Sequence, residues 1–168
     1  MKNNIVLIGM PGAGKSTLGV ILAKVLAMDF VDCDLVIQKQ EGRTLSRIIE
    51  EEGADGFIKT EERINASLSC ENCVIATGGS AVYGEAAMEN LKKDAVAVYL
   101  RLSYENVSAR LHNIKGRGVV LKEGQTFQEL FKERSSLYEK YADIIIDEDG
   151  LDVEQTLSAV VEELKKCR

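Results

Sequence analysis

The sequence has little that would suit a membrane, an oxidising compartment or a nucleic-acid partner. No tryptophan, one proline and one histidine occur among its 168 residues. No uninterrupted apolar run approaches the roughly 20 residues that span a bilayer, and Ile5–Ile8 is too short for a signal-peptide core. The formal net charge of -6 argues against binding to nucleic-acid phosphates, which requires clustered Lys and Arg. We therefore expect a cytoplasmic protein that binds neither membranes nor nucleic acids.

The four cysteines and the single histidine form no recognisable metal or redox motif. Cys70 and Cys73 have the spacing of a zinc knuckle, but no second cysteine pair or nearby histidine completes such a site. Sequences of the thioredoxin type also surround a cysteine pair differently. We interpret the cysteines as reduced thiols, and His112 as a solvated helix residue rather than a base.

Short apolar runs alternate with helical periodicity along the chain, without repeats, low-complexity tracts or an interdomain linker. With 45% hydrophobic residues, the chain suits a single domain over residues 1–168. The alternation predicts an α/β three-layer sandwich, in which helices cover both faces of a parallel sheet. The five predicted strands are Ile5–Ile8, Asp29–Asp34, Val74–Thr77, Ala95–Leu100 and Ile144–Ile146, and helical patterns cover Leu18–Leu26, Glu85–Lys92, Ser103–His112, Thr126–Tyr141 and Asp152–Lys166.

The segment from Gly9 to Thr17 fits the phosphate-binding P-loop, which is a glycine, four residues, then Gly-Lys-Ser. Its glycines let backbone N–H groups curl around a polyphosphate, and the following helix N-terminus adds positive potential. Lys15 can reach the outer phosphates, and the Ser16 hydroxyl can ligate Mg²⁺. The chain is therefore predicted to bind a nucleoside triphosphate with magnesium, through Gly12, Ala13, Gly14, Lys15, Ser16 and Thr17.

Two carboxylates, Asp32 and Asp34, end the second predicted strand, at the sheet edge where open α/β sheets bind ligands. Alternation along a strand would place both on the same side. One could hold hydrated magnesium and the other could accept the proton of an attacking hydroxyl, unless Asp34 simply caps a helix. Residues 35–69 show helical patterns without a strand signal, so we expect a helical insertion that binds the acceptor.

The third predicted strand runs into Gly78, Gly79 and Ser80, which would face the same crevice. Their backbone N–H groups could bind a substrate, although a plain turn has the same composition. Farther along, Arg134 and Tyr138 share one face of a predicted helix, at positions i and i+4.

Residues 113–125 form a basic, glycine-punctuated segment between two predicted helices. This composition suits a lid that carries Arg117 onto the nucleotide and shuts out water. Water exclusion matters because an exposed γ-phosphate would be hydrolysed rather than transferred. The alternative is an ordinary surface loop.

Taken in order, these residues resemble shikimate kinases, small members of the nucleoside monophosphate kinase-like group of P-loop proteins. The resemblance extends over nearly the whole chain, and the ordered set is much more specific than any one motif. The matching residues are Gly12–Thr17, Asp32 and Asp34 after an aromatic, Gly56-Phe57 followed by Glu61, Ala76–Gly79, Arg110, Arg117, Glu133-Arg134 and Tyr138.

The resemblance implies a P-loop NTPase fold of the nucleoside monophosphate kinase type, with sheet order 2-3-1-4-5. It also implies an ATP-dependent kinase with Mg²⁺ as cofactor, which phosphorylates a hydroxyl of shikimate in aromatic amino acid biosynthesis. By resemblance, Lys15, Asp34 and Arg117 are catalytic, with Asp34 as the base, Ser16 and Asp32 serve magnesium, Arg110 lies against the nucleotide base, and Gly78, Gly79 and Arg134 bind the acceptor.

Two departures from the family pattern concern the acceptor. The family has an arginine after the phenylalanine, where it helps to hold the shikimate carboxylate, and this chain has Ile58. The third glycine after the threonine is Ser80 here. Lys59 is a poor substitute, because neighbouring residues on a helix point about 100° apart. Gly118 replaces a usual proline of the lid, which should loosen it.

The sequence therefore leaves three hypotheses. The leading one is a shikimate kinase. The second is a kinase of the same type that acts on a different small hydroxylated acceptor, with Ile58 as an apolar wall. The third is a nucleotide-binding regulatory module with degenerate catalysis, which the retention of Lys15, Asp34 and Arg117 disfavours. No extended apolar stripe requires a partner chain, so we expect a monomer.

Overall fold

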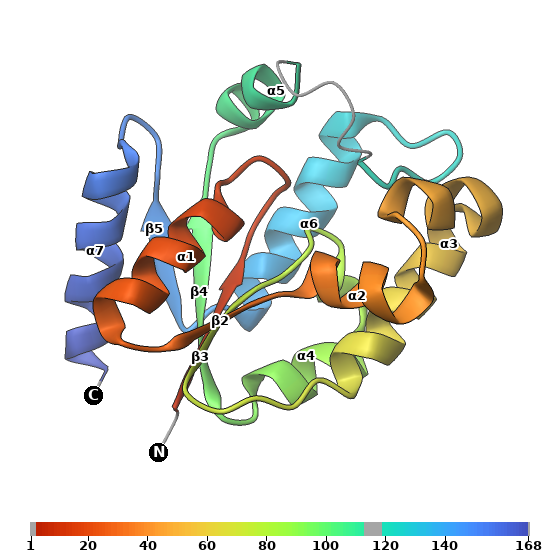
Figure 1. Ribbon diagram of the computed structural model, residues 1–168. Helices are drawn as coiled ribbons and strands as arrows, with labels where there is room; N and C mark the ends of the chain where they lie inside the picture. The colour runs from red at the N-terminus through yellow and green to blue at the C-terminus, as the bar shows by residue number, and fades with distance from the viewer. Residues whose placement is uncertain (1–2, 113–118, 168) are drawn as a thin grey trace.

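The computed structural model describes residues 3–112 and 119–167. This part of the chain forms one parallel sheet with helices on both sides (Figure 1). None of its helices combines the length and the apolar composition that crossing a membrane requires.

The sheet has the predicted five strands in the predicted order, β2-β3-β1-β4-β5. Neighbouring strands are parallel throughout the sheet. All five residues of the central strand are buried, and its Ile5 pairs with Val74 on one side and Val96 on the other. The strands are β1 (Asn4–Ile8), β2 (Asp29–Asp32), β3 (Cys73–Ala76), β4 (Ala95–Arg101) and β5 (Ile144–Asp147).

The last two helices begin one residue after the predicted starts, Thr126 and Asp152, which are their N-caps. Thr126 with Glu129, and Asp152 with Gln155, form the capping boxes of the last two helices. The helices are α1 (Lys15–Leu26), α2 (Cys33–Glu41), α3 (Leu45–Ala66), α4 (Glu85–Lys92), α5 (Tyr104–His112), α6 (Phe127–Tyr141) and α7 (Val153–Lys166), with a short 3₁₀ helix, η1, at Ala81–Tyr83.

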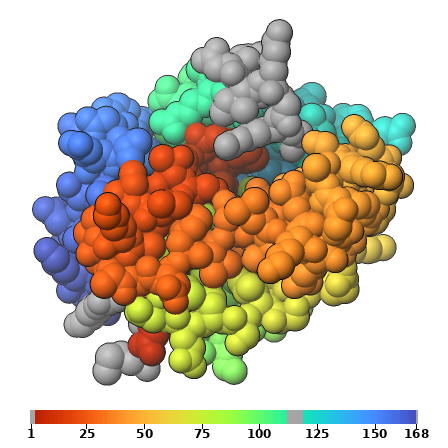
Figure 2. Space-filling view, viewed as in Figure 1, coloured from red at the N-terminus to blue at the C-terminus, as the bar shows by residue number. Residues whose placement is uncertain are grey.

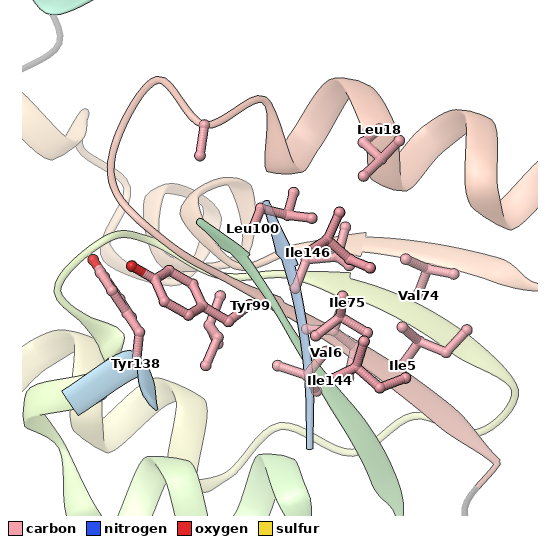
Figure 3. Close-up of a cluster of buried hydrophobic side chains, with 14 of the residues drawn as sticks. Ile5, Val6, Leu18, Val74, Ile75, Tyr99, Leu100, Tyr138, Ile144 and Ile146 are labelled. Atoms are coloured by element: carbon pink, nitrogen blue, oxygen red, sulfur yellow. The ribbon is translucent and has the colours of Figure 1, made fainter. Parts of the chain in front are cut away.

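Helices cover both faces of the sheet, as the alternating pattern predicts. α1 packs on β2 and β3 beside α7, whereas α4 and α6 pack against β4 on the other face (Figure 1). Branched side chains such as Ile5, Val74 and Ile75 fill the space between the layers (Figure 3). The rings of Tyr99 on β4 and Tyr138 on α6 lie 5.0 Å apart between centroids and carry this core toward the carboxyl ends of the strands.

The segment predicted as a helical insertion folds into α2 and α3, which lie beside the sheet (Figure 1). Gly42 ends α2 with a φ of 63°, a left-handed conformation that glycine adopts without strain. We call the small apolar cluster of these helices the insertion core; its buried side chains are Ile37, Ile48, Phe57, Ile64 and Val120, the last from the segment before α6.

The second strand is shorter than predicted. β2 ends at Asp32 and α2 begins at Cys33, so Asp34 lies in the first turn of a helix. Asp32 is the N-cap, and its Oδ1 accepts a hydrogen bond of 2.9 Å from the Asp34 N–H. Because Asp32 satisfies an N–H group in the first turn of α2, the helix begins where the predicted strand would have continued to Asp34. The prediction that strand alternation places Asp32 and Asp34 on the same side was therefore wrong. The helix-capping role that was considered for Asp34 belongs to Asp32.

Much of the predicted lid lies outside the described residues. The positions that the structure does not describe are 113–118, which include Arg117 and Gly118. The structure describes only the end of the segment, residues 119–125, where the Gln125 N–H donates to the Lys122 carbonyl in a turn (3.0 Å). The lid therefore stays a prediction.

The packing of α1 on the sheet predicts that Gly19 cannot carry a side chain. A Cβ at this position would lie 2.6 Å from Cε2 of Phe30 and 3.3 Å from Cδ1 of Leu7. We expect Gly19→Ala to lower the free energy of unfolding by about 1–3 kcal/mol, the usual cost of overpacking, as measured by chemical denaturation. Val20→Ala, on the exposed side of the same helix, is the matched control. Equal stability of Gly19→Ala and the parent would contradict this prediction.

Candidate active site

A cavity of about 440 Å³ opens at the carboxyl ends of the central strands. The space-filling view shows the surface hollowed between the P-loop and the helices α2 and α3 (Figure 2). This edge is where ligands of open α/β sheets bind. Predicted site residues from four separate segments line the cavity, namely Gly12, Gly14, Lys15, Ser16 and Thr17, then Asp32 and Asp34, then Gly78, Gly79 and Ser80, and finally Arg134.

The P-loop has the backbone that a phosphate cradle requires. Gly12 and Gly14 have φ angles of 84° and 83°, and Gly14 is the N-cap of α1. The Lys15 ammonium donates to the carbonyls of Gly9 (2.7 Å) and Met10 (2.9 Å). Positive charge and the N-terminal dipole of α1 therefore coincide at the loop, which suits an anionic phosphate.

Ser16 and Asp32 lie together beside the P-loop. The Ser16 hydroxyl donates to Oδ2 of Asp32 over 2.7 Å. Hydroxyl and carboxylate oxygens are ligands that Mg²⁺ accepts, and this ion is usually held by one or two protein groups together with phosphates and water. The two residues therefore fit a magnesium ion that is bound with a nucleotide.

Asp34 faces the glycine turn that follows β3. A Cβ on Gly78 would lie 3.0 Å from Oδ1 of Asp34 and 2.5 Å from Oε1 of Glu61. The two carboxyl groups therefore lie against the same backbone atom, and a side chain at position 78 would displace them. An acceptor hydroxyl held on this turn would be within reach of Asp34 as a base.

Glu61 is a cavity residue to which the sequence analysis gave no role. Its side chain lines the cavity and is almost completely buried. Oε2 accepts a hydrogen bond from the Ser80 hydroxyl (2.5 Å), whereas Oε1 has no hydrogen-bond partner among the described residues. Burial raises the pKa of Glu61 to about 7, although the Ser80 hydrogen bond favours the ionised form. The cavity therefore contains, beside Asp32 and Asp34, a third carboxyl group, whose pKa burial raises to about 7.

Arg134 is a buried cation on the acceptor side of the cavity. Its Nη2 donates to the Val120 carbonyl (3.1 Å), and its Nη1 would lie 3.0 Å from a Cβ on Gly79. One helical turn later, the Tyr138 hydroxyl donates to the Gly79 carbonyl over 2.6 Å. This confirms that the two α6 residues share a face. A buried guanidinium next to a cavity is suited to an anionic group of a ligand.

The two acceptor-side departures from the family pattern have different surroundings. Ile58 is partly buried against the insertion core, while α3 turns Phe57 and Glu61 into the cavity. Lys59 is exposed. Ser80 is buried, lines the cavity and binds Glu61. Ser80 therefore changes the lining of the cavity directly. Ile58 replaces the charged arginine of the family pattern with an apolar side chain.

The nucleotide side receives Arg110 from α5. Its Nη1 donates to the Gly12 carbonyl over 3.0 Å, which places the side chain against the P-loop. Arg117 lies outside the described residues. Glu148, just after β5, lies within electrostatic reach of Arg110 and Lys15 but is not among the residues that line the cavity. Glu148 is buried. Burial raises its pKa to about 7, although the positive charges of Arg110 and Lys15 favour the ionised carboxylate.

Burial of Glu61 predicts a pH dependence of stability. Its pKa is about 7 in the folded protein and 4.5 as an ordinary glutamate. The folded state therefore binds more protons than the unfolded state between these values, and the free energy of unfolding should fall as pH rises through them. Glu61→Gln should reduce the total decline in the free energy of unfolding by a few kcal/mol at most, because one pKa unit corresponds to about 1.4 kcal/mol.

Chemical denaturation at several values between about pH 5 and pH 8 would measure the effect. Glu148 contributes in the same pH range, so Glu148→Gln gives its share separately and the double variant should be flattest. If the free energy of unfolding of Glu61→Gln falls with pH as steeply as that of the parent, Glu61 is ionised in the folded protein over this pH range.

Comparisons with known proteins agree with this geometry. A family model for shikimate kinase matches residues 11–165. The shikimate kinase of Pasteurella multocida (strain Pm70) is 40% identical over 152 residues, which cover 88% of this chain and 87% of that protein. The shikimate kinase of Thermodesulfovibrio yellowstonii is 39% identical over 166 residues, with coverage of 97% and 95%.

Solved structures give the same result. The chain is similar to the shikimate kinase from Acinetobacter baumannii in complex with shikimate, with a TM-score of 0.89 and 31% identity over 99% of this chain and 94% of that one. Thymidylate kinase from Candida albicans, with a TM-score of 0.63 and 15% identity over 98% and 91%, shares the fold alone. The chain described here is a P-loop kinase and belongs to the shikimate kinase family.

Proposed function

We propose that this protein transfers the γ-phosphoryl group of ATP to a hydroxyl group of shikimate. The observation that carries the proposal is the shared cavity, in which Lys15 and Ser16 of the P-loop lie on one side and Asp34 and Arg134 on the other. A nucleotide and a small acceptor can therefore meet in one open cavity. Membership of the shikimate kinase family supports this choice of acceptor.

On the nucleotide side, the chain supplies positive charge and backbone donors. Lys15 neutralises the outer phosphates, and the N-terminus of α1 adds its dipole. Arg110 donates a hydrogen bond to the Gly12 carbonyl, and by family resemblance it contacts the nucleotide base. Because phosphoryl transfer depends mainly on positioning and charge neutralisation, these groups account for a large part of the catalysis.

We assign the magnesium site to Ser16 and Asp32. Their hydroxyl and carboxylate oxygens lie 2.7 Å apart, so one small ion can contact both after their hydrogen bond opens. When bound there, Mg²⁺ would neutralise negative charge that develops on the phosphates during transfer.

On the acceptor side, Asp34 orients the attacking hydroxyl and accepts its proton. The turn from Gly78 to Ser80 receives the ring of the acceptor, and Arg134 holds its carboxylate by charge-assisted hydrogen bonds. Glu61 lies beside Asp34. Burial, together with the negative charge of Asp34, raises the pKa of Glu61, and a protonated Glu61 avoids placing two negative charges next to each other.

The domain assignment is part of the same proposal. Residues 1–168 would form one kinase domain, with residues 35–69 as the acceptor-binding insertion and residues 113–125 as a lid that brings Arg117 to the phosphates. The insertion core and the cavity-lining side chains of α3 support the role of the insertion. A monomeric state and a cytoplasmic location remain predictions from the sequence.

Ile58 favours one alternative, a different small hydroxylated acceptor. Among the described residues that line the cavity, the cations are Lys15 on the nucleotide side and Arg134 on the acceptor side. An acceptor without a carboxylate would need less positive charge than shikimate. This candidate keeps the enzyme class and the catalytic groups and changes the substrate.

The first prediction of the proposal concerns ADP release by the purified protein with Mg-ATP. Shikimate should stimulate release in the parent protein, and Asp34→Asn should lower turnover by about 100-fold or more, the usual contribution of a general base. ATP binding should be nearly unchanged, because the P-loop is intact. Asp29→Asn, at the exposed start of β2, is the matched control and should behave like the parent.

Two outcomes would change this assignment. Comparable turnover in Asp34→Asn would remove Asp34 from the role of base. A parent protein that ignores shikimate but responds to a polyol, a sugar acid, a hydroxylated amino acid or a nucleoside monophosphate would support the alternative acceptor.

The second prediction tests the pocket with Ile58→Arg. A charge-assisted hydrogen bond contributes about 1.5–3 kcal/mol, so the KM for shikimate should fall by about tenfold or more. Steady-state kinetics would measure this, with Ile58→Met as a control of similar size and no charge. An unchanged KM for shikimate in Ile58→Arg would indicate that the pocket is built for another acceptor.

A further inference from the structure

The ring of Tyr83 lies beside two cations at the acceptor end of the site. Tyr83 is the last residue of η1, which directly follows the glycine turn. The guanidinium carbon of Arg134 lies over the ring at 5.4 Å from its centroid, and Nζ of Lys122 lies at the same distance. Both distances fall within the roughly 6 Å over which a cation is attracted to an aromatic face.

Arg134 has few other groups that fix the plane of its guanidinium. The side chain is 1% exposed, so water can supply little hydrogen bonding. Nη2 donates to the Val120 carbonyl, but Nε has no hydrogen-bond partner among the described residues. A guanidinium carries five N–H donors in a fixed fork, and its orientation decides which of them reach a ligand. The Tyr83 ring is therefore one restraint on that orientation, together with Tyr138 and the charge of Glu61.

Lys122 brings a second positive charge to the same ring. It belongs to the segment before α6 that also supplies Val120 to the insertion core. Its ammonium lies 3.9 Å from Oε1 of Glu133, and about half of its side chain is exposed. Tyr83 thus connects the glycine turn, α6 and the segment 119–125 at one place.

The aromatic face of Tyr83, rather than its hydroxyl, makes these contacts. The hydroxyl is buried with Glu133 and Arg134 near it, but neither forms a hydrogen bond of good geometry with it in the part of the chain that the structure describes. Removing it should therefore cost little, because no hydrogen bond is lost. Phenylalanine would retain the face and leucine would not.

We propose that Tyr83 is a positioning residue for acceptor binding, whose ring holds Arg134 in the orientation that receives the anionic group of the acceptor. This inference rests on the proposed function, since it assumes an acceptor with a carboxylate. Tyr83 need not touch the acceptor. Because Ile58 contributes no charge, the orientation of Arg134 carries more of the affinity here.

Steady-state kinetics with shikimate and Mg-ATP test the proposal. Tyr83→Leu should raise the KM for shikimate about 3- to 30-fold, the range that corresponds to a partly buried cation–aromatic contact. The kcat and the KM for ATP should change less than about twofold, because an interaction present throughout the reaction affects binding alone. Tyr83→Phe should resemble the parent protein.

A series of progressively fluorinated phenylalanines at position 83 separates ring electrostatics from packing. Fluorination weakens the negative face of the ring with little change in its size, so the KM for shikimate should rise stepwise along the series. Tyr141→Leu is the matched control, because Lys140 lies over that ring at 5.0 Å near the end of α6. It should leave the KM for shikimate unchanged.

Several results would overturn the proposal. These are equal KM values for Tyr83→Leu and Tyr83→Phe, a flat fluorine series, or a Tyr83→Leu variant that loses kcat and affinity for both substrates together. In an Arg134→Lys background, Tyr83→Leu should add little to the KM, and a full additional effect would also contradict it.

Shikimate-dependent ADP release by the parent protein separates a failure of the proposed function from a failure of this proposal. A parent without shikimate-dependent ADP release overturns the proposed function. In that case, thermal unfolding of Tyr83→Leu, Arg134→Lys and the double variant decides whether Tyr83 restrains Arg134. Additive shifts in Tm would overturn the restraint, and non-additive shifts would support it.

Discussion

The packing of the glycine turn directly onto the P-loop is the constraint on which the site depends. A Cβ on Gly79 would lie 2.6 Å from Cδ of Pro11, and the Tyr138 hydroxyl binds the Gly79 carbonyl from the other side. The P-loop and the glycine turn therefore meet where the rigid ring of Pro11 packs on the backbone of Gly79, and neither group has much freedom to move. Such contact suits a transfer reaction, because small errors in the distance between reactants are costly.

The sequence was most informative where function depends on local geometry. The P-loop combines a required glycine spacing with a strand before it and a helix after it, and both flanking elements form as predicted. Capping boxes at Thr126 and Asp152 likewise marked helix starts, because a cap is a contact between residues three apart. The sheet order came from the family resemblance, since strand alternation alone does not specify which strands are neighbours.

Contacts between distant segments were not predictable from local patterns. Glu61 is one of many acidic residues on α3, and its special state arises from burial and from Ser80, nineteen positions away. Tyr83 has no sequence signal of its own, because Arg134 reaches it from another helix. The error at Asp34 has a different cause: a capping carboxylate ended the strand at Asp32, where alternation suggested that it continued.

The separate insertion core has a consequence for how such enzymes diversify. Its side chains come from α2, α3 and the segment that contains Val120, whereas the sheet and the P-loop belong to the main core. Replacements such as Ile58 act on the smaller unit and leave the packing around β1 unaffected. New acceptor specificities can therefore evolve through substitutions in this unit at positions away from Asp34, with the packing of the P-loop left in place.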